Sequence, residues 1–156
     1  MYESMLQNVQ GLLEGECHPL ANAANLSALL FQEIEGLNWA GFYFMHGGEL
    51  LLGPFQGKPA CLRIALSRGV CGVAARENRT MLVDDVHAFP GHIACDEASR
   101  SELVCPIRLD GRVIGVIDLD SARPARFTPE EQRAVEAVAA LYAEGCDFSD
   151  AGYSLT

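Results

Sequence analysis

The chain is poor in basic residues, with 11 Lys and Arg against 21 Asp and Glu and a formal net charge of −10 over 156 residues. Nucleic acids and anionic membrane surfaces are bound through clusters of Lys and Arg, so we expect neither as a partner. No apolar run is long enough to span a bilayer, and Met1–Met5 lacks the basic and then apolar pattern of a signal peptide. We therefore expect a cytoplasmic protein.

Several familiar ligand-site patterns are also missing. No C-x-x-C pair occurs, and Cys95 with His92 offers only two closely spaced candidate ligands, so we do not expect a zinc site. The glycines of Arg68–Gly72 lack the full spacing of a phosphate-binding P-loop. We predict neither a metal nor a bound cofactor.

The sequence has the pattern of one ordinary α+β domain. Helices are expected over residues 2–13, 19–35, 69–76 and 129–144, and strands over residues 38–45, 49–52, 61–66, 80–83, 103–109 and 112–119. Thr128, Pro129 and Glu131 form the capping pattern that begins the last helix. Length and element order predict a single domain over residues 1–156, with its core at about 19–145, in which helices pack on an antiparallel sheet.

Two pairings are possible for the hairpin around Asp110–Gly111. A two-residue loop would pair Leu109 with Arg112, whereas a three-residue loop with a left-handed glycine bulge would pair Arg108 with Arg112. We favour the three-residue loop because it keeps one face of the hairpin wholly apolar.

The favoured pairing places Glu102 opposite Asp118, with Asp120 two residues further along the same face. Carboxylates this close raise one another's pKa, so one of the three can stay protonated near neutral pH. We therefore predict an acidic cluster at one end of the hairpin.

Six cysteines in a chain without an export signal are expected to be thiols at rest rather than structural bridges. Cys95 lies between His92 and Asp96 in the long predicted loop 84–101, and loops of this length are usually functional. A thiol there can act as a nucleophile if its pKa is lowered. A Cys-His hydrolase, with His87 or His92 as base, is one chemistry that this arrangement allows, although no third orienting residue is evident.

The other cysteines carry weaker signals. Cys71 stands at a helix start, where the helix dipole favours a thiolate, but its apolar surroundings favour a buried structural role. Cys61 begins a predicted strand, and its pattern decides nothing. Cys17, Cys105 and Cys146 are expected to be structural, with Cys105 on the apolar face of the hairpin.

Trp39 and Tyr43 lie on one face of a predicted strand, with Gly41 between them. Aromatic residues at this spacing usually belong to a core, but they would also pack well against a thioether or sulfoxide sulfur. This pair is the candidate apolar wall of a substrate site.

A combination of motifs is spread over seven segments of the chain. These are Asn38–Tyr43, Leu52–Cys61, Gly69–Gly72, Asp85–His87, Gly91–Asp96, Ser101–Val104 and Gly115–Ser121. Together they resemble the free methionine-(R)-sulfoxide reductases, which are single GAF domains, and the resemblance runs roughly from the second helix to the closing helix. It implies a GAF-like antiparallel sheet flanked by helices and a thiol-dependent reductase.

The resemblance also implies roles for individual residues. Cys95 falls on the catalytic cysteine of the family, Cys61 on its usual resolving cysteine, and Cys71 on a third, auxiliary thiol. The substrate-binding positions fall on Trp39, Glu102, Asp118 and Asp120, and the three carboxylates are also the candidate proton donors. Such an enzyme would convert free L-methionine-(R)-S-oxide to L-methionine through a cysteine sulfenic acid. Cys61, or less favourably Cys71, would then form an intramolecular disulfide that thioredoxin or a similar dithiol reduces.

Another function compatible with this fold is a non-enzymatic GAF sensor that binds a small molecule. Most GAF domains are such modules, so the fold alone would favour this interpretation. Three thiols placed with carboxylates argue against it, and a chain of this length is expected to leave no room for an output domain. The apolar stripe of residues 2–13 allows a homodimer through terminal helices.

Overall fold

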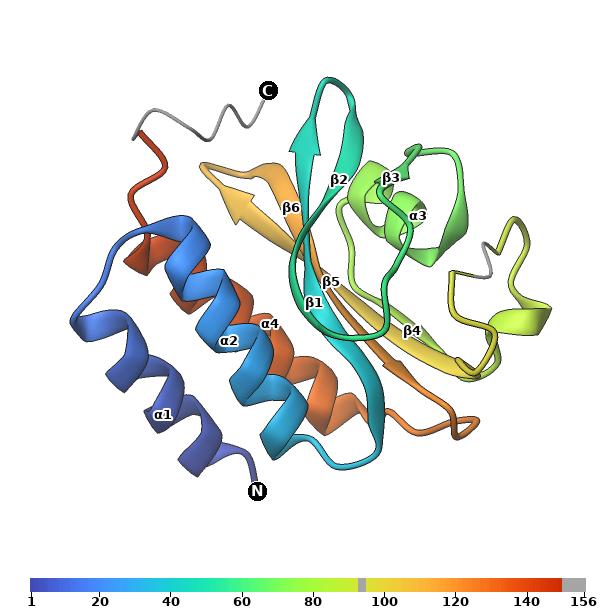
Figure 1. Cartoon of the computed structure of the whole chain (residues 1–156), viewed down its shortest axis with the longest axis horizontal. Helices are drawn as coiled ribbons and strands as arrows, with labels where there is room; N and C mark the ends of the chain where they lie inside the picture. The colour runs from blue at the N-terminus through green and yellow to red at the C-terminus, as the bar shows by residue number, and fades with distance from the viewer. Residues whose placement is uncertain (93–94, 150–156) are drawn as a thin grey trace.

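The computed structural model describes residues 1–92 and 95–149, and a six-stranded antiparallel sheet forms the centre of this part of the chain (Figure 1). Its strands are β1 (Leu37–His46), β2 (Glu49–Gly57), β3 (Arg63–Ile64), β4 (Met81–Val83), β5 (Ser101–Leu109) and β6 (Arg112–Ser121). They lie in the order β3-β2-β1-β6-β5-β4. The long β1 is therefore hydrogen-bonded to β2 on one side and to β6 on the other.

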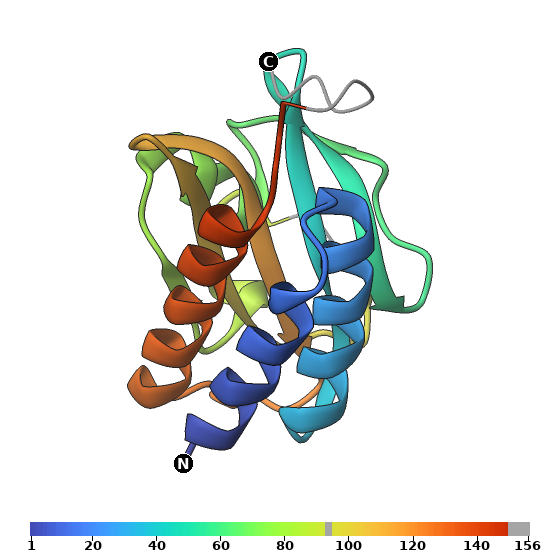
Figure 2. The same ribbon diagram turned by 90° about the vertical axis from the view of Figure 1, so that its left-hand side faces the viewer.

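The helices are divided between the two faces of the sheet. Three of them, α1 (Glu3–Glu14), α2 (Pro19–Glu33) and α4 (Pro129–Gly145), lie together on one face (Figure 2). The short α3 (Gly69–Glu77) lies on the other face, and the 3-10 turn η1 (Val86–Ala88) begins the long segment that leads to β5. This confirms the predicted α+β architecture. No helix in the described part of the chain is long and apolar enough to cross a membrane.

Alternation along β1 divides its side chains between two cores. Ala40, Phe42 and Phe44 belong to the larger core, which includes buried residues of α1, α2 and α4. Trp39 and Tyr43 point to the opposite face and join a smaller core that includes residues of α3. Trp39 and Tyr43 can therefore contribute to a site only on the face of the sheet that carries α3.

The hairpin between β5 and β6 does not have the predicted loop. Leu109 pairs with Arg112 across Asp110 and Gly111, whose φ angles are 53° and 77°, so the loop has two residues rather than three. A bulge next to Ile107 then adds one residue to β6, because Ile107 pairs with Gly115 and the following residue pairs with Val113.

The bulge changes the partner of Glu102 but not its face. The predicted pairing of Glu102 with Asp118 is wrong, because Glu102 pairs with Asp120, and Asp118 pairs with Val104. The two-residue loop and the bulge together preserve the alternation, so Cys105 still lies in the helix-facing core. The three carboxylates consequently remain together on the opposite face, as predicted.

Two strand boundaries also differ from the prediction. β2 continues well beyond Leu52, because an irregularity opposite Phe42 absorbs Pro54 without ending the pairing with β1. The strand predicted over residues 61–66 shortens to Arg63–Ile64, which leaves Cys61 in the loop before β3.

The start of α4 has the capping box that the sequence predicts. The Thr128 side chain accepts a hydrogen bond from the backbone N–H of Glu131, and the Glu131 carboxylate accepts one from the backbone N–H of Thr128. The guanidinium of Arg126 pairs with the same carboxylate at 2.7 Å. These contacts fix the beginning of the helix.

Candidate active site

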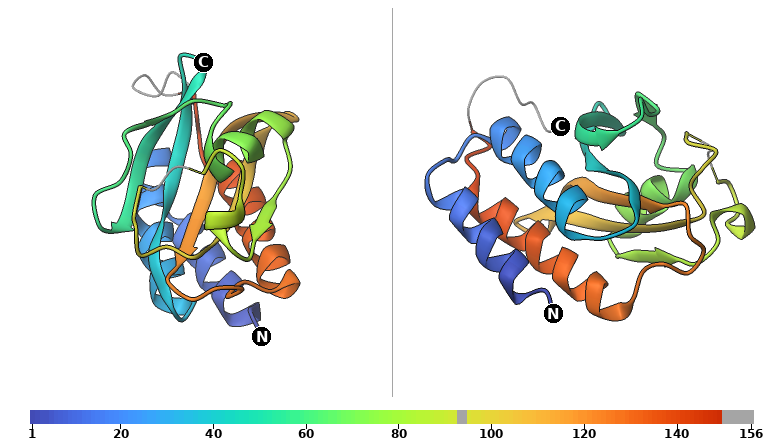
Figure 3. Two further views of the ribbon diagram at one scale, coloured as in Figure 1. Left: turned by 90° about the vertical axis from the view of Figure 1, so that its right-hand side faces the viewer. Right: turned by 60° about the horizontal axis from the view of Figure 1, so that its bottom comes forward.

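A pocket is lined by residues on the face of the sheet that carries α3. Figure 3 shows that α3 lies on the opposite side of the sheet from α1, α2 and α4. Its walls come from β1, β5, β6, α3 and the loops before β3 and β5. Of the predicted site residues, Trp39, Tyr43, Cys71, Cys95, Glu102, Asp118 and Asp120 line it. Cys61 is not part of the wall, but it is bonded to Cys95, which is.

Cys61 and Cys95 are joined by a disulfide, with 5.5 Å between their Cα atoms. The two residues are 34 positions apart, and the bond connects the loop before β3 to the loop before β5. It links the pair that the family resemblance implies. Composition predicts thiols at rest, whereas this structure holds the two cysteines in their bonded form, because the fold brings their sulfurs to bonding distance.

Glu102 on β5 and Asp118 and Asp120 on β6 form one acidic cluster in the pocket. Glu102 is 7% exposed and Asp118 is 5% exposed. Burial, followed by repulsion from neighbouring carboxylates, raises the pKa of Glu102 and of Asp120 well above their ordinary values. Burial also raises the pKa of Asp118, although hydrogen bonds with Glu102 and Cys71 oppose the change. The cluster can therefore keep a proton at a pH where an exposed carboxyl group has lost it.

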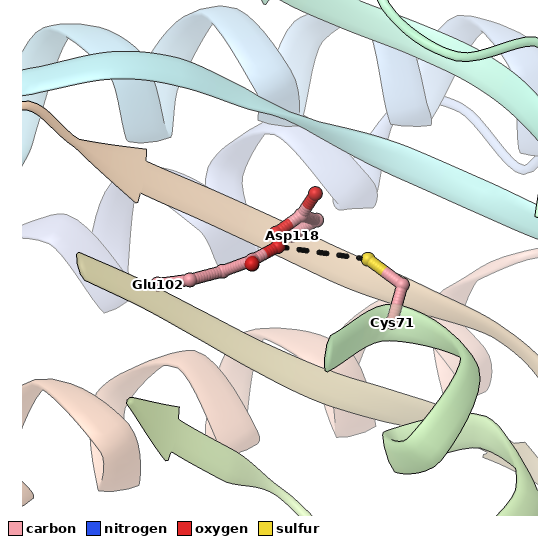
Figure 4. A group of neighbouring side chains, drawn as sticks. All are labelled: Cys71, Glu102 and Asp118. Atoms are coloured by element: carbon pink, nitrogen blue, oxygen red, sulfur yellow. Dashed lines mark hydrogen bonds between the residues drawn. The ribbon is translucent and has the colours of Figure 1, made fainter. Parts of the chain in front are cut away.

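Cys71 faces this cluster from the first turn of α3 (Figure 4). Its Sγ atom lies 3.8 Å from Oε2 of Glu102, in position to donate a weak hydrogen bond. Burial, and then the charges of Asp118 and Glu102, raise the pKa of the Cys71 thiol well above its ordinary value. The thiolate that the helix dipole alone would favour is therefore not the resting form, because burial and the carboxylates outweigh the dipole.

Cys71, Glu102 and Asp118 form a group that can hold a cation. One ligand atom from each lies within 4.8 Å of the other two. The Oδ1 atom of Asp118 is buried and has no hydrogen-bond partner within the described residues. Once a cation displaces their protons, the two carboxylates and the thiolate are acceptors, so the group suits an ammonium ion as well as a metal such as zinc. That the chain uses no metal stays a prediction.

Trp39 and Tyr43 form the apolar wall of the pocket. Their ring centroids are 5.8 Å apart, and Phe55 stacks against Trp39 with its centroid at 5.2 Å. Gly41 makes room for this stack, because a Cβ atom there would lie 2.4 Å from Cβ of Phe55 and 2.7 Å from the Trp39 ring. The contribution of Phe55 is not predicted from the sequence, because the strand was expected to end at Leu52.

Polar atoms of the two aromatic side chains bind the chain segment that contains Cys61. The Trp39 indole Nε1 donates to the carbonyl oxygen of Lys58 at 3.1 Å. The Tyr43 hydroxyl donates to the carbonyl oxygen of Cys61 at 2.9 Å. The loop before β3 is therefore attached to the central strand of the sheet.

Asn38 is a further residue to which the sequence assigns no role. Its Nδ2 group donates to Oδ2 of Asp96 and to Oγ of Ser99, both at 3.0 Å. Asp96 follows Cys95 directly, so Asn38 attaches the segment after the disulfide to β1. Its place in the motif segment Asn38–Tyr43 gives no indication of this contact, which joins residues 58 positions apart.

The two loop histidines do not form the arrangement of a thiol hydrolase. His92 lines the pocket, and its ring packs edge-on against His87 with 5.9 Å between centroids. Burial, and then the neighbouring His87, lower the pKa of His92. The sulfur of Cys95 is bonded to Cys61 rather than placed against an imidazole base, so this geometry gives the hydrolase hypothesis no support.

Comparison with known proteins agrees with the site. Residues 21–145 match the family model described as the GAF domain. The chain is 46% identical over 139 residues to the free methionine-R-sulfoxide reductase of Escherichia coli, covering 89% of this chain and 84% of that protein. The protein of the same name from Saccharomyces cerevisiae is 41% identical over 154 residues, covering 94% and 86%.

A solved structure of a free methionine-R-sulfoxide reductase is also similar to this chain. The X-ray structure of free methionine-R-sulfoxide reductase from Neisseria meningitidis in complex with its substrate has a TM-score of 0.89 and 40% sequence identity to this chain. The match covers 92% of this chain and 87% of that one. Sequence, fold and family model therefore agree that the chain belongs to the free methionine-R-sulfoxide reductase family of GAF domains.

Proposed function

We propose that the protein reduces free L-methionine-(R)-S-oxide to L-methionine with electrons from Cys95 and Cys61. The observation that carries the proposal is the Cys61–Cys95 disulfide, which lies beside a pocket with a buried acidic cluster and an aromatic wall. The names of the bacterial and yeast relatives support the same reaction, and so does the substrate complex of the Neisseria enzyme.

Free methionine sulfoxide is a zwitterion with a polar S=O group, and the pocket has complementary features. The substrate ammonium group would bind the acidic cluster, where the unpartnered Oδ1 atom of Asp118 is one acceptor. The methyl-sulfur end would pack against Trp39 and Tyr43. Binding at both ends would hold the sulfoxide sulfur within reach of Cys95.

The first chemical step transfers oxygen to Cys95. The Cys95 thiolate attacks the sulfoxide sulfur while a protonated carboxyl group of the cluster gives its proton to the sulfoxide oxygen. The oxygen leaves the substrate and remains on Cys95 as a sulfenic acid, and methionine departs as the thioether. Glu102 and Asp120 are the candidate donors, because the pKa of each is well above its ordinary value.

The second step forms the disulfide. The thiol of Cys61 attacks the sulfur of the Cys95 sulfenic acid, and water leaves. Two electrons from thioredoxin or a similar dithiol then return both cysteines to thiols. Cys71 is the weaker candidate for this step, because the pKa of its thiol is raised by burial and by the carboxylates beside it.

An activity assay tests the proposal directly. The reduced protein, supplied with dithiothreitol, should convert free methionine-(R)-sulfoxide to methionine, and the (S) epimer should serve as the matched negative substrate. Cys95→Ser should abolish turnover. Full turnover by Cys95→Ser would show that the nucleophile is another residue, and an absence of turnover by the native protein would contradict the proposed function.

Peptide mapping after one turnover without reductant tests the resolving step. We expect a Cys61–Cys95 link in the native protein and in Cys71→Ser. A link between Cys71 and Cys95 in the native protein would reassign the resolving thiol.

A further inference from the structure

We infer that the Tyr43 hydroxyl positions the resolving cysteine, Cys61, for disulfide formation. The ring of Tyr43 belongs to the pocket wall, but its hydroxyl is engaged with the chain that carries Cys61 rather than with the acidic cluster. The inference rests on the proposed function, since it assigns a group to the second step of that reaction.

The contact is direct and involves the residue that reacts. The Tyr43 hydroxyl donates to the carbonyl oxygen of Cys61 at 2.9 Å. The carbonyl carbon and the Cβ–Sγ arm of Cys61 share one Cα atom, so holding the carbonyl restricts where the sulfur can lie. The next residue, Leu62, is bound to β2, because its carbonyl oxygen accepts from the backbone N–H of Leu52 at 2.9 Å. Cys61 itself is not among the paired residues of β3.

Tyr43 is a rigid support for this contact. It lies in the middle of β1, which is hydrogen-bonded to β2 and β6, and its side chain is 2% exposed. The Trp39 indole makes a second contact from the same face of β1, to the carbonyl oxygen of Lys58. The segment Lys58–Cys61 is therefore attached to the central strand at both ends by a buried aromatic donor.

The hydroxyl remains a donor throughout the reaction. Burial, and then the charge of Asp118, raise the pKa of Tyr43 far above its ordinary value, so the group stays protonated at any pH where thiol chemistry proceeds. A donor that never ionises can hold the Cys61 carbonyl while the protonation states of the acidic cluster change.

Positioning matters most in the second step. Once the sulfenic acid forms, Cys61 must bring its sulfur to Cys95, whose Cα lies 5.5 Å from its own in the disulfide. Holding the two sulfurs close together and correctly oriented lowers the entropy cost of the reaction and accelerates disulfide formation. Loss of one neutral hydrogen bond should therefore slow disulfide formation by about three- to tenfold.

The test separates the two steps with hydrogen peroxide as oxidant. Peroxide converts the Cys95 thiolate to sulfenic acid and releases hydroxide, so no methionine sulfoxide is needed. Dimedone then traps the sulfenic acid, and intact mass measures the loss of two hydrogens on disulfide formation. In Tyr43→Phe, which retains the ring, sulfenic acid should form at the native rate, the disulfide should close about three- to tenfold more slowly, and the dimedone adduct should accumulate.

Tyr142→Phe is the matched control. Its buried hydroxyl also donates to a backbone carbonyl, that of Pro19 at 2.8 Å, but on the helix-facing side of the sheet. Neither the sulfenic acid step nor the disulfide step should change in this variant.

The equilibrium constant for disulfide formation against a glutathione buffer provides a second readout. It should fall in Tyr43→Phe by a similar factor but not in Tyr142→Phe.

Each outcome decides the inference. Native disulfide kinetics and an unchanged equilibrium constant in Tyr43→Phe would overturn it, and so would an equal delay in Tyr142→Phe. A slower sulfenic acid step would assign the hydroxyl to the first reaction instead. If methionine sulfoxide is not reduced but peroxide-driven closure still depends on Tyr43, the proposed function fails while the positioning role stands.

Discussion

Reduction of the Cys61–Cys95 disulfide should make the folded protein substantially less stable. The bond joins residues 34 positions apart, so breaking it restores the loop freedom of the unfolded chain between them. The loop-closure relation for a segment of this length gives a loss of about 4 kcal/mol at 25 °C. A protein of this size should lose about 8 to 16 °C in Tm for that change.

Equilibrium unfolding in urea measures this difference. The protein is oxidised with one equivalent of methionine-(R)-sulfoxide or peroxide, or kept reduced with a phosphine, and the two unfolding midpoints are compared. Cys95→Ser cannot form the bond, so its midpoint should be the same with and without phosphine. Cys71→Ser keeps both bonded cysteines and should show the same difference as the native protein.

Equal midpoints for oxidised and reduced native protein would refute the reasoning. They would mean that strain in the folded, bonded state cancels the loop entropy, or that the unfolded chain already holds the two loops together. The expected difference has a functional meaning as well, because reduction should loosen the loops before β3 and β5 at the stage when substrate must enter.

Three other changes test the site and the fold. Glu102→Gln should lower the turnover number by about 10²- to 10⁴-fold if Glu102 is the proton donor; native turnover would leave Asp120 as the donor. Folding raises the pKa of Glu102, so the protonated carboxyl group contributes stability that is fully present below about pH 4.5 and is lost as the pH rises through the pKa of the folded state. In thermal unfolding, the glutamine variant should therefore gain stability relative to the native protein toward neutral pH. Gly41→Ala should cost about 1–3 kcal/mol in urea unfolding and raise KM, because the new methyl group displaces Trp39 or Phe55; an unchanged KM would separate Gly41 from the pocket. Thr128→Ala should cost about 1 kcal/mol through loss of the helix cap and leave kcat unchanged.

The helices and the faces of the strands could be predicted because they depend on local patterns. The last helix was expected over residues 129–144 and is Pro129–Gly145, since a cap, a first-turn proline and an apolar stripe all lie within its own sequence. The side on which Cys105 lies also follows from alternation alone.

The hairpin register could not be predicted in the same way. The two predicted pairings differed only at the turn, whereas the structure combines the two-residue loop with a bulge further along, in β6. The bulge lets the Asp110–Gly111 turn adopt its positive φ angles without rotating the apolar face of the hairpin away from α4. The energy that selects it comes from packing against another element, which no pattern within the hairpin contains.

The resting state of Cys71 shows a similar limit. Its position in the first turn of a helix favours a thiolate, and that feature is visible in the sequence. The opposing effects are burial and the charges of Asp118 and Glu102, which come from strands far away in the chain. Their combined influence on the pKa of the thiol is larger than that of one helix end.

The sequence by itself determined the α+β class, the sides of the strands and, through its motifs, the family and the residue types that can act on a sulfoxide. These depend on periodicity and on short segments, both of which are local. Only the tertiary structure decided that Cys61, rather than Cys71, is bonded to Cys95, and that Tyr43 holds the Cys61 carbonyl. Those contacts join residues on different elements, so their distances depend on how the strands pair and how the loops pack against the sheet.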